Sequence, residues 1–560
     1  MSARASAIRQ QAEVGPRGIA GSALEMTAGM SAQSQKRRAR RASRHPTPFI
    51  VLDPAHRDPL HRQLYNAIRT AIVSGRLPAG SRLPSTRALA TETGVSRVTV
   101  SAAFDQLRAE GYVEARTGSG TFVREGLPDD ALHTRRSSLR RTPPAPPSTT
   151  PRAVTAAPAT PVGPTGTSAF RIGLPALDLF PVGLWARIAA RRWRGVAGEE
   201  AERLLGYGYP MGYDPLRKAI ADYVNLSRGV RCEARQVIVT SGAQQALDLV
   251  ARVLLKPGEA AWLEDPGYFG ARETLRAAGA AIVPVPVDGD GLDTAAGEAL
   301  NPAARLAYVS PSYQFPLGAT MTMQRRLALL DWAGRAGAWI VEDDYDGEFR
   351  YVGRPLASLQ GLDAERSAAG GVPGRVLYVG TFSKTLFPSL RLGYVIVPEA
   401  LVDTFAAAKA AADRHTATVE QAVLADFIEE GHYTRHVRRM RLVYASRQAT
   451  LIAAAGTHLS RWLDLRPAAA GMHLVGWLRP DVLGGVTDED LSEAANAAGV
   501  FVTPLSSYRT PALHDDAYPA PPGGLVFGYA GCSDAMIWDG ARRLGRAIEG
   551  HLELRSAPRA

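Results

Sequence analysis

A single lysine stands among hydroxyl residues in the segment 381–394 (TFSKTLFPSLRLGY). Its apolar neighbours favour the deprotonated amine of Lys384, and such an amine forms a Schiff base with an aldehyde. The hydroxyls of Thr381 and Ser383 and the guanidinium of Arg391 are groups that hold a phosphate dianion. A lysine amine that can react with an aldehyde, next to groups that can bind a phosphate, predicts pyridoxal 5'-phosphate as the cofactor.

Three segments before Lys384 carry residues that suit the same cofactor. Residues 237–247 (VIVTSGAQQAL) predict a strand, a turn of small residues and a helix whose first amides can bind a phosphate. Residues 262–269 (WLEDPGYF) predict a strand followed by an aromatic residue that can stack on a flat ring. Residues 339–346 (WIVEDDYD) predict a strand that ends in acids, and an aspartate paired with a pyridine nitrogen makes the ring an electron sink. Taken singly, each segment also fits an ordinary helix cap or a half-buried core residue.

The composition of the chain divides it into four regions. Residues 1–46 are rich in Ala, Ser, Gly, Arg and Gln without periodicity, which predicts a disordered basic extension. Residues 47–125 predict a compact set of helices and turns, and residues 126–168, which include the run TPPAPP, predict an extended linker. Apolar strand-like runs then alternate with helical ones, which predicts a large α/β domain over residues 169–555.

The region 47–125 has the parts of a helix-turn-helix. Apolar residues at every fourth position predict a helix over residues 59–74. Hydroxyl caps at Ser85 and Ser96 predict two more helices, which are separated by a tight turn over residues 93–95. Two short strands around glycines in residues 111–123 complete the pattern as a winged hairpin. These elements predict a DNA-binding domain that is mainly helical with a small β wing.

Composition and charge agree with a soluble protein that contacts a polyanion. The 560 residues carry a formal charge of +11, with basic runs at residues 36–41 and 135–141 on either side of the helix-turn-helix. Such a distribution favours nucleic acid as a partner. The apolar runs are too short to cross a membrane and no secretory signal is evident, so a cytoplasmic protein is expected. The two cysteines, Cys232 and Cys532, suggest neither a disulfide framework nor a metal site.

The segments LPSTR (83–87), GVSRVTV (94–100), LRAEGYV (107–113) and GSGTFV (118–123) resemble the winged helix of the GntR family of regulators. That resemblance implies contacts with double-stranded DNA from the start of the second helix, from the recognition helix and from the wing. Arginine forks and small hydroxyls near helix N-termini suit phosphates and guanine edges. The residues at those positions are Arg87, Ser96, Arg97, Thr99 and Gly118.

Residues 170–550 resemble the fold-type I aminotransferases, because the phosphate turn, stacking aromatic, acid, lysine and arginine follow one another in that family's order. By the resemblance, Tyr268 would stack on the cofactor ring, Asp343 would pair with the ring nitrogen and Tyr345 would donate to the ring hydroxyl. Lys384 would form the Schiff base. The phosphate would be held by Gly242, Ala243, Gln244, Thr381, Ser383 and Arg391.

The two halves in this order resemble the MocR-type regulators, a branch of the GntR family. The resemblance implies that the aminotransferase-like domain senses a ligand and that the protein forms a head-to-tail homodimer. In such folds a tyrosine of the segment 207–212 (YGYPMG) reaches the cofactor of the partner subunit. Tyr207 is therefore a predicted cofactor contact across the dimer.

Two positions depart from working aminotransferases. Phe315 stands where those enzymes carry an asparagine beside the ring hydroxyl, and its side chain makes no hydrogen bond. Val526 stands where they carry the arginine that grips the substrate carboxylate. Arg509 from a neighbouring loop could bind an effector carboxylate instead. Without such an arginine, either the effector is not a simple α-amino acid or the cofactor is itself the signal.

These features favour a pyridoxal-phosphate-dependent transcription factor. In this hypothesis Lys384 senses the cofactor itself, or an amine or amino acid that displaces the lysine, and the binding of DNA changes in response. A half-transamination is compatible with that role. The alternative is a pyridoxal-phosphate-dependent aminotransferase that carries a DNA-binding domain, and steady turnover would identify it.

Overall fold

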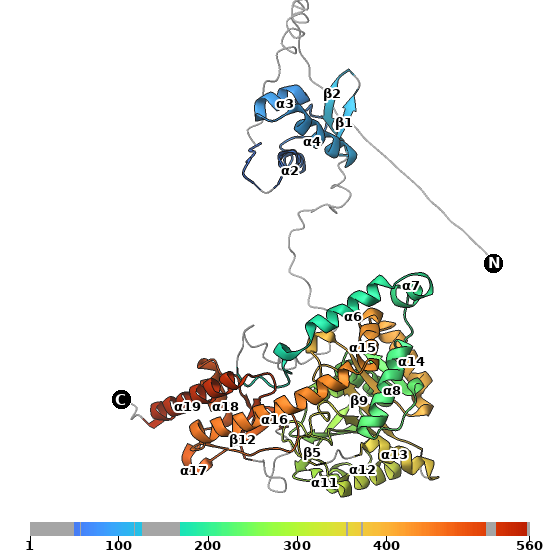
Figure 1. The fold of residues 1–560 in the computed structure, drawn as a ribbon, viewed down its shortest axis with the longest axis vertical. Helices are drawn as coiled ribbons and strands as arrows, with labels where there is room; N and C mark the ends of the chain where they lie inside the picture. Colours follow the sequence, from blue (N-terminus) through green and yellow to red (C-terminus); the bar gives the residue numbers. More distant parts are fainter. Residues whose placement is uncertain are drawn as a thin grey trace, which may run out of the picture. The chain divides into compact units, whose positions relative to one another are not determined.

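The computed structural model describes residues 50–56, 58–116, 118–125, 169–353, 357–370, 373–510 and 522–556. The chain divides into two compact units, one on each side of the bond after Pro151, and each unit is described by itself (Figure 1). The predicted extension over residues 1–46 and the predicted linker over residues 126–168 lie outside the described residues.

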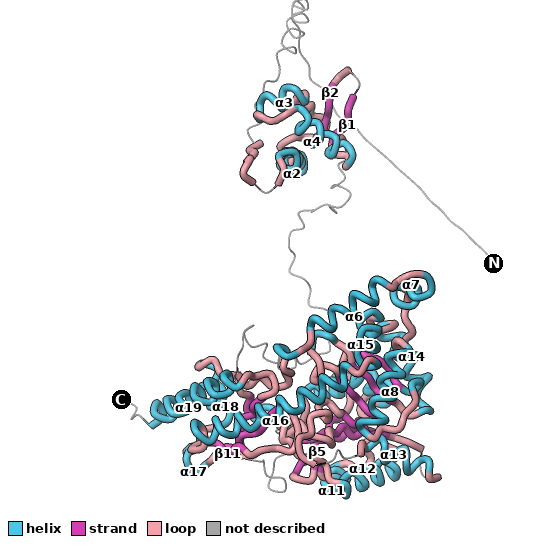
Figure 2. Tube along the Cα trace, viewed as in Figure 1, coloured by secondary structure: helices cyan, strands magenta, loops and turns pink. Residues whose placement is uncertain are grey.

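In the described part of the first unit, helices pack beside a two-stranded hairpin (Figure 2). β1 and β2 pair antiparallel, with Val113 opposite Val123. The predicted winged helix-turn-helix is therefore confirmed. The elements are α2 (Leu60–Val73), α3 (Thr86–Thr93), α4 (Arg97–Ala109), β1 (Val113–Arg116) and β2 (Gly120–Val123).

The predicted hydroxyl caps begin α3 and α4. Ser85 Oγ accepts a hydrogen bond from Ala88 N at 3.2 Å, and Ser96 Oγ accepts one from Thr99 N at 3.1 Å. Between the two helices Gly94 has a φ of +70°, a left-handed conformation that glycine adopts without strain. Cap, glycine turn and cap therefore set the two helices of the motif beside each other.

The fourfold spacing of apolar residues buries one face of α2 against α4. Leu64, Ile68 and Ile72 of α2 are at most 2% exposed. They join Val100 and Leu107 of α4, both fully buried, in one hydrophobic cluster. Since isolated helices of this length are marginal in water, this shared cluster stabilises the motif.

A mixed eight-stranded sheet lies at the centre of the described part of the second unit, in the order β3-β10-β9-β8-β7-β4-β5-β6. Strands β9, β8, β7, β4 and β5 run parallel, whereas β10 is antiparallel to both of its neighbours. The strands are β3 (Val237–Thr240), β4 (Ala260–Asp265), β5 (Ala281–Asp288), β6 (Gly291–Leu292), β7 (Leu306–Val309), β8 (Trp339–Asp343), β9 (Val376–Thr381) and β10 (Gly393–Ile396).

Helices cover both faces of this sheet. Successive residues of a strand point to opposite faces, so neighbouring residues of a buried strand pack against different helices. In β7, Tyr308 packs with α9, α10 and α14, whereas Val309 packs with α12 and α13. At the β3 end of the sheet, α6, α8 and α15 pack against the face toward which Val309 points. These helices are α6 (Val182–Arg194), α8 (Asp214–Arg228), α9 (Ala243–Leu254), α10 (Phe269–Ala277), α12 (Met323–Ala336), α13 (Leu359–Ala368), α14 (Val402–Asp413) and α15 (Thr418–Glu429).

A smaller antiparallel sheet, in the order β11-β12-β14-β13, lies toward the C-terminus. It packs against α16 and α19, which lie side by side (Figure 1). These elements, with the remaining short helices, are α7 (Gly198–Leu205), α11 (Thr294–Leu300), α16 (His432–His458), β11 (Leu463–Leu465), β12 (His473–Leu478), α17 (Pro480–Leu483), α18 (Asp488–Ala497), β13 (Thr503–Pro504), β14 (Gly524–Gly528) and α19 (Asp534–Ser556).

The predicted α/β fold of the second region is confirmed by this arrangement of sheets and helices. Among the described residues, none of the helices is long and apolar enough to cross a membrane.

Candidate functional site

Most of the predicted cofactor residues gather where β3, β4, β8 and β9 end. Asp343 is the last residue of β8, and Thr381 is the last residue of β9. Gly242 caps α9 after β3, and Tyr268 caps α10 after β4. Parallel strands bring their carboxyl ends to one edge of a sheet, which is where α/β folds bind ligands. A cavity of about 320 Å³ lies there, and the predicted residues that line it are Ala243, Gln244, Tyr268, Asp343, Tyr345, Thr381, Ser383, Lys384 and Arg391.

Asp343 has one carboxylate oxygen bound to the protein and the other one available. Its Oδ2 accepts a hydrogen bond from Tyr308 Oη at 2.6 Å, whereas its Oδ1 is buried with no hydrogen-bond partner among the described residues. Burial raises the pKa of Asp343 to about 6, although the Tyr308 hydrogen bond opposes that rise. A buried carboxylate oxygen is costly unless a partner satisfies it. A protonated ring nitrogen would be such a partner.

The neighbouring Asp344 has a structural role. Arg228 donates from Nε to Asp344 Oδ2 at 2.7 Å and from Nη2 to Asp344 Oδ1 at 2.9 Å, and Tyr378 Oη donates to the same carboxylate. Burial acts against ionisation, but the Arg228 guanidinium holds the pKa of Asp344 below its ordinary value. The pair joins the end of α8 to the end of β8, and it leaves Asp343 as the carboxylate that faces the cavity.

Lys384 reaches the cavity from the loop between β9 and β10. Its Nζ donates a hydrogen bond to Gly173 O at 3.0 Å. Burial lowers the pKa of Lys384, opposed by the nearby Asp346 and Asp343, and a lower pKa leaves more of the neutral, nucleophilic amine. Gly173 has a φ of +77°, and a Cβ there would lie 2.5 Å from Nζ. Sequence reasoning missed Gly173, because only the fold brings the segment before α6 to Lys384.

Arg391 and the N-terminus of α9 form an anion site. Arg391 Nη2 donates to Ser241 O at 2.6 Å, and a Cβ at Gly242 would lie 3.2 Å from the same nitrogen. Gly242 also has a φ of +99°, a conformation that favours glycine, and a Cβ there would crowd the Arg391 guanidinium. Ala243 and Gln244 follow as the first residues of the helix and line the cavity. The free amides of a helix N-terminus attract phosphate, and a nearby arginine adds to that attraction.

Aromatic rings surround Phe315 at the cavity. Its centroid lies 6.1 Å from that of Tyr268, 6.2 Å from Tyr345, 5.3 Å from His473 and 5.1 Å from Tyr508. Burial raises the pKa of Tyr268 to about 12 and lowers the pKa of His473 to about 4. Both side chains are therefore uncharged at neutral pH, and this part of the wall carries no net charge.

The residues present fit pyridoxal phosphate. The buried Oδ1 of Asp343 matches a protonated ring nitrogen, and the anion site matches a phosphate. Gly173 and Gly242 leave space at positions where a Cβ would crowd Lys384 and Arg391. The set can therefore bind the cofactor's three distinctive groups, the ring nitrogen, the phosphate and the aldehyde.

Gly242 does not line the cavity itself but caps α9 next to the lining residue Ala243, whereas Tyr207 and Arg509 lie away from the cavity. Tyr207 is 82% exposed, with the Arg414 guanidinium 4.4 Å from its ring centroid, and it lines a separate hollow. Arg509 donates from Nη2 to Pro522 O at 2.8 Å and does not line the cavity, although Tyr508 does. The subunit contact of Tyr207 and the effector contact of Arg509 stay predictions.

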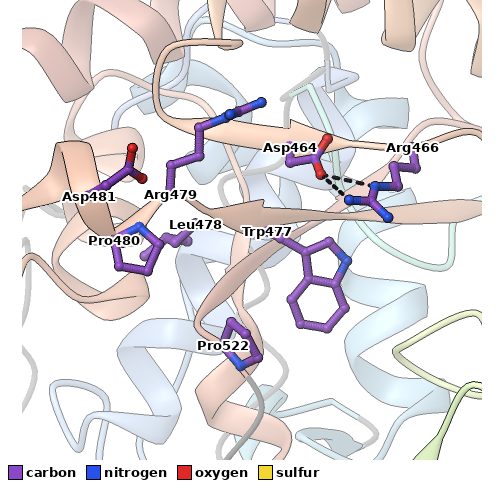
Figure 3. A pocket seen from close by; sticks show the side chains of 8 residues that line it. All are labelled: Asp464, Arg466, Trp477, Leu478, Arg479, Pro480, Asp481 and Pro522. Carbon is purple, nitrogen blue, oxygen red and sulfur yellow. Dashed lines mark hydrogen bonds and ion pairs between the residues drawn. The ribbon is translucent and has the colours of Figure 1, made fainter.

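Another hollow lies beside the small sheet, around Trp477 (Figure 3). Its Arg466 is paired with Asp464 at 2.8 Å. None of the predicted site residues lines this hollow, and it contains no lysine. Without a lysine, its lining cannot provide the amine that the predicted Schiff base needs.

The five predicted DNA contacts lie at the surface of the first unit. Thr99 is half-buried, and the others are exposed. Ser96 is the N-cap of α4 and Arg97 is its first residue. Gly118 lies in the turn between the two strands of the wing, with a φ of +73°. Ser96 serves as a helix cap as well, because its Oγ accepts the Thr99 amide. The five residues are Arg87, Ser96, Arg97, Thr99 and Gly118.

Val98 on the same helix is an exposed apolar residue that the sequence predictions did not include. Its side chain is 79% exposed, whereas Val100 two residues later is fully buried. A valine on the polar face of an amphipathic helix was the signal that could have identified it. An exposed apolar side chain at the start of a recognition helix can contact a thymine methyl group.

Family comparisons match both units. The model of the bacterial regulatory proteins of the gntR family matches residues 60–123, and the model of aminotransferase class I and II matches residues 185–544. The probable rhizopine catabolism regulatory protein MocR of Rhizobium meliloti is 42% identical over 504 residues, which cover 89% of this chain and 96% of that protein. The HTH-type pyridoxine biosynthesis transcriptional regulator PdxR of Corynebacterium glutamicum is 30% identical, covering 87% of this chain and 96% of that protein.

A solved aminotransferase structure is also similar. LysN, an alpha-aminoadipate aminotransferase of Thermus thermophilus in complex with N-(5'-phosphopyridoxyl)-L-leucine, matches with a TM-score of 0.60 and 32% identity. The match covers 69% of this chain and 92% of that one. Together with the family model over residues 185–544, this likeness confirms the predicted fold-type I class of the second region.

Proposed function

Because this chain belongs to the MocR-type branch of the GntR transcriptional regulators, with an aminotransferase class I and II domain, we propose that its affinity for DNA depends on pyridoxal phosphate bound at Lys384. The observation that carries the proposal is one cavity lined by Lys384, Asp343 and Arg391 in a chain that also has a winged helix-turn-helix. The signal is the cofactor itself, or an amine or amino acid that competes with the lysine.

Each cavity residue has a role in this proposal. Bound pyridoxal phosphate would supply an aldehyde carbon that exchanges one primary amine for another without a change in oxidation state. Lys384 provides the resident amine, and Asp343 keeps a proton on the ring nitrogen. Tyr268 stacks on the ring and Tyr345 donates to the ring hydroxyl. The phosphate is held by Gly242, Ala243, Gln244, Thr381, Ser383 and Arg391.

Regulation requires that the ligand-bound and ligand-free states differ in their affinity for DNA. We propose that the protein acts in the cytoplasm as a head-to-tail homodimer, in which Tyr207 reaches the cofactor of the partner subunit. The exposure of Tyr207 supports this arrangement, because a side chain that contacts a partner must be accessible in the single chain.

Phe315 and Val526 weigh against the alternative, an aminotransferase. Val526 is fully buried in β14, and Phe315 places a ring without a hydrogen-bonding group at the cavity. We expect at most one half-reaction for each bound cofactor when the protein is mixed with an amino donor and a keto acid. Sustained production of the new amino acid, followed by chromatography, would favour the enzyme.

Arg97→Ala is expected to weaken the binding of operator DNA by about 1–3 kcal/mol, because an arginine at the start of a recognition helix binds phosphates or guanine edges. Arg108→Ala is the matched control. Arg108 lies near the end of the same helix, 57% exposed, and is paired with Asp105 at 2.7 Å. Mobility-shift titrations at fixed salt compare the two variants. Equal losses would contradict the assignment of Arg97.

A further inference from the structure

One part of the cavity wall is apolar. Behind it, Val526 of β14 packs in the same hydrophobic cluster as four of the lining residues and is fully buried. Phe315 is the centre of this region, since its ring meets those of Tyr268 and Tyr508 edge to face. The lining residues here, called the apolar wall, are Ile172, Phe269, Phe315, Met472 and Tyr508.

Each cation that lines the cavity already has a role in binding the cofactor. Among the described lining residues these are Lys384 and Arg391. Arg391 Nη2 donates to Ser241 O at the N-terminus of α9, which is the anion site for the phosphate. Lys384 is the amine that a ligand must displace. His473 lies 3.0 Å from Pro316 O through Nε2, and burial keeps it neutral by lowering its pKa to about 4.

A ligand carboxylate would therefore meet no free cation in the described part of this cavity. It would lose its water against the apolar wall without gaining an ion pair, and the carboxylate of Asp343 faces the same space. An arginine fork usually offsets that loss, and Val526 offers none at the corresponding position. An uncharged group loses little when it packs against the same wall, and it gains from burial.

We infer that the effector is a primary amine that carries no carboxylate or other acidic group and whose remainder is uncharged. The inference rests on the proposed function, because the amine acts at Lys384. The amino group takes the place of Lys384, and the uncharged remainder lies against the apolar wall.

Matched pairs of probes test this inference, each pair differing only in the α-carboxylate. The pairs are 2-phenylethylamine with L-phenylalanine and propylamine with L-2-aminobutyrate. Full-length protein loaded with pyridoxal phosphate and freed of excess cofactor is titrated by calorimetry, and the visible spectrum is followed in parallel. We expect each amine to bind at least about tenfold more tightly than its acid.

Val526→Arg supplies the missing cation and is expected to reverse the preference within each pair. The control is Val482→Arg, which adds the same charge at a position that is 37% exposed in α17, outside the cavity. Because an arginine at position 526 could prevent folding, the comparison of each amine with its acid on the unaltered protein stands without it.

The outcomes separate the inference from the proposed function. If the protein acquires a visible band but binds the acids as tightly as the amines, the inference is wrong and the proposed function stands. Binding of neither member of either pair, with the band present, also overturns the inference and leaves the cofactor itself as the signal. No visible band at all would overturn the proposed function.

Discussion

Lys384→Ala is expected to abolish the visible absorbance band that the full-length protein acquires with pyridoxal phosphate. The band arises from the link between the cofactor's aldehyde and a lysine amine, and Lys384 is the one lysine among the described residues that line the cavity. Burial lowers the pKa of Lys384, which leaves more of the neutral amine that reacts with the aldehyde. Spectra recorded after removal of free cofactor measure the effect.

Two control variants make this result specific. Lys384→Arg keeps a positive charge but cannot form the link, so it should lose the band as completely as the alanine variant. Lys256→Ala removes an exposed lysine outside the cavity and should leave the band unchanged. A band of normal intensity in the Lys384→Ala protein would mean that another amine carries the cofactor.

Asp343→Asn is expected to weaken the binding of pyridoxal phosphate by about 100-fold, because it removes the charge that holds a proton on the ring nitrogen inside a buried site. The asparagine can still accept the hydrogen bond from Tyr308. Tyr308→Phe is the complementary variant, because it removes only that 2.6 Å hydrogen bond, and it should cost about tenfold. Titrations of protein fluorescence with the cofactor give both constants. Wild-type affinity in Asp343→Asn would refute the assigned role.

The same variant has a predictable effect on pH dependence. Burial raises the pKa of Asp343 to about 6 in the cofactor-free protein, so the carboxylate is ionised at pH 7.5 and mostly protonated at pH 5. Only the ionised form pairs with a protonated ring, and affinity should therefore fall by about tenfold between those values in the wild type. The Asp343→Asn protein should lack this component. Parallel curves for the two proteins would show that another group causes the fall.

The sequence predicted the helices of the first unit well, because their caps and apolar spacing depend on residues that are close together in the chain. The Ser85 and Ser96 caps lie within three residues of the amides they accept, and each begins its helix as expected. The predicted helix over residues 59–74 occurs as Leu60–Val73, because its apolar spacing is set within one segment. Alternating strands and helices indicated the α/β fold in the same way.

Partners distant in the sequence could not be predicted. Tyr308 lies in a fully buried strand, which is typical of a core residue, and only the pairing of β7 with β8 brings it to Asp343. The Arg228–Asp344 pair joins residues 116 positions apart. From the sequence, where this pair is not visible, only the family resemblance distinguishes Asp343 from Asp344. The contact of Gly173 with Lys384 spans 211 positions and has the same origin.

Tyr207 and Arg509 both lie outside the lining of the cavity. Tyr207 is highly exposed, as a contact to a partner subunit would require, but the chain's own cavity is lined without it. Arg509 follows a residue that lines the cavity and directs Nη2 to Pro522 O. Cofactor titration of Tyr207→Phe tests the first prediction. Titration of Arg509→Ala with L-phenylalanine and with 2-phenylethylamine tests the second, because the loss of a carboxylate contact would weaken only the binding of the acid.

The most direct test of the central claim is a mobility-shift titration of the full-length protein on the intergenic DNA beside its own gene, with and without pyridoxal phosphate. The coupling of the two sites predicts that the cofactor changes the dissociation constant for DNA by about tenfold in the wild type and leaves that of Lys384→Ala unchanged. An unchanged constant in the wild type, or an equal change in the Lys384→Ala variant, would contradict the proposal that Lys384 couples pyridoxal phosphate to DNA binding.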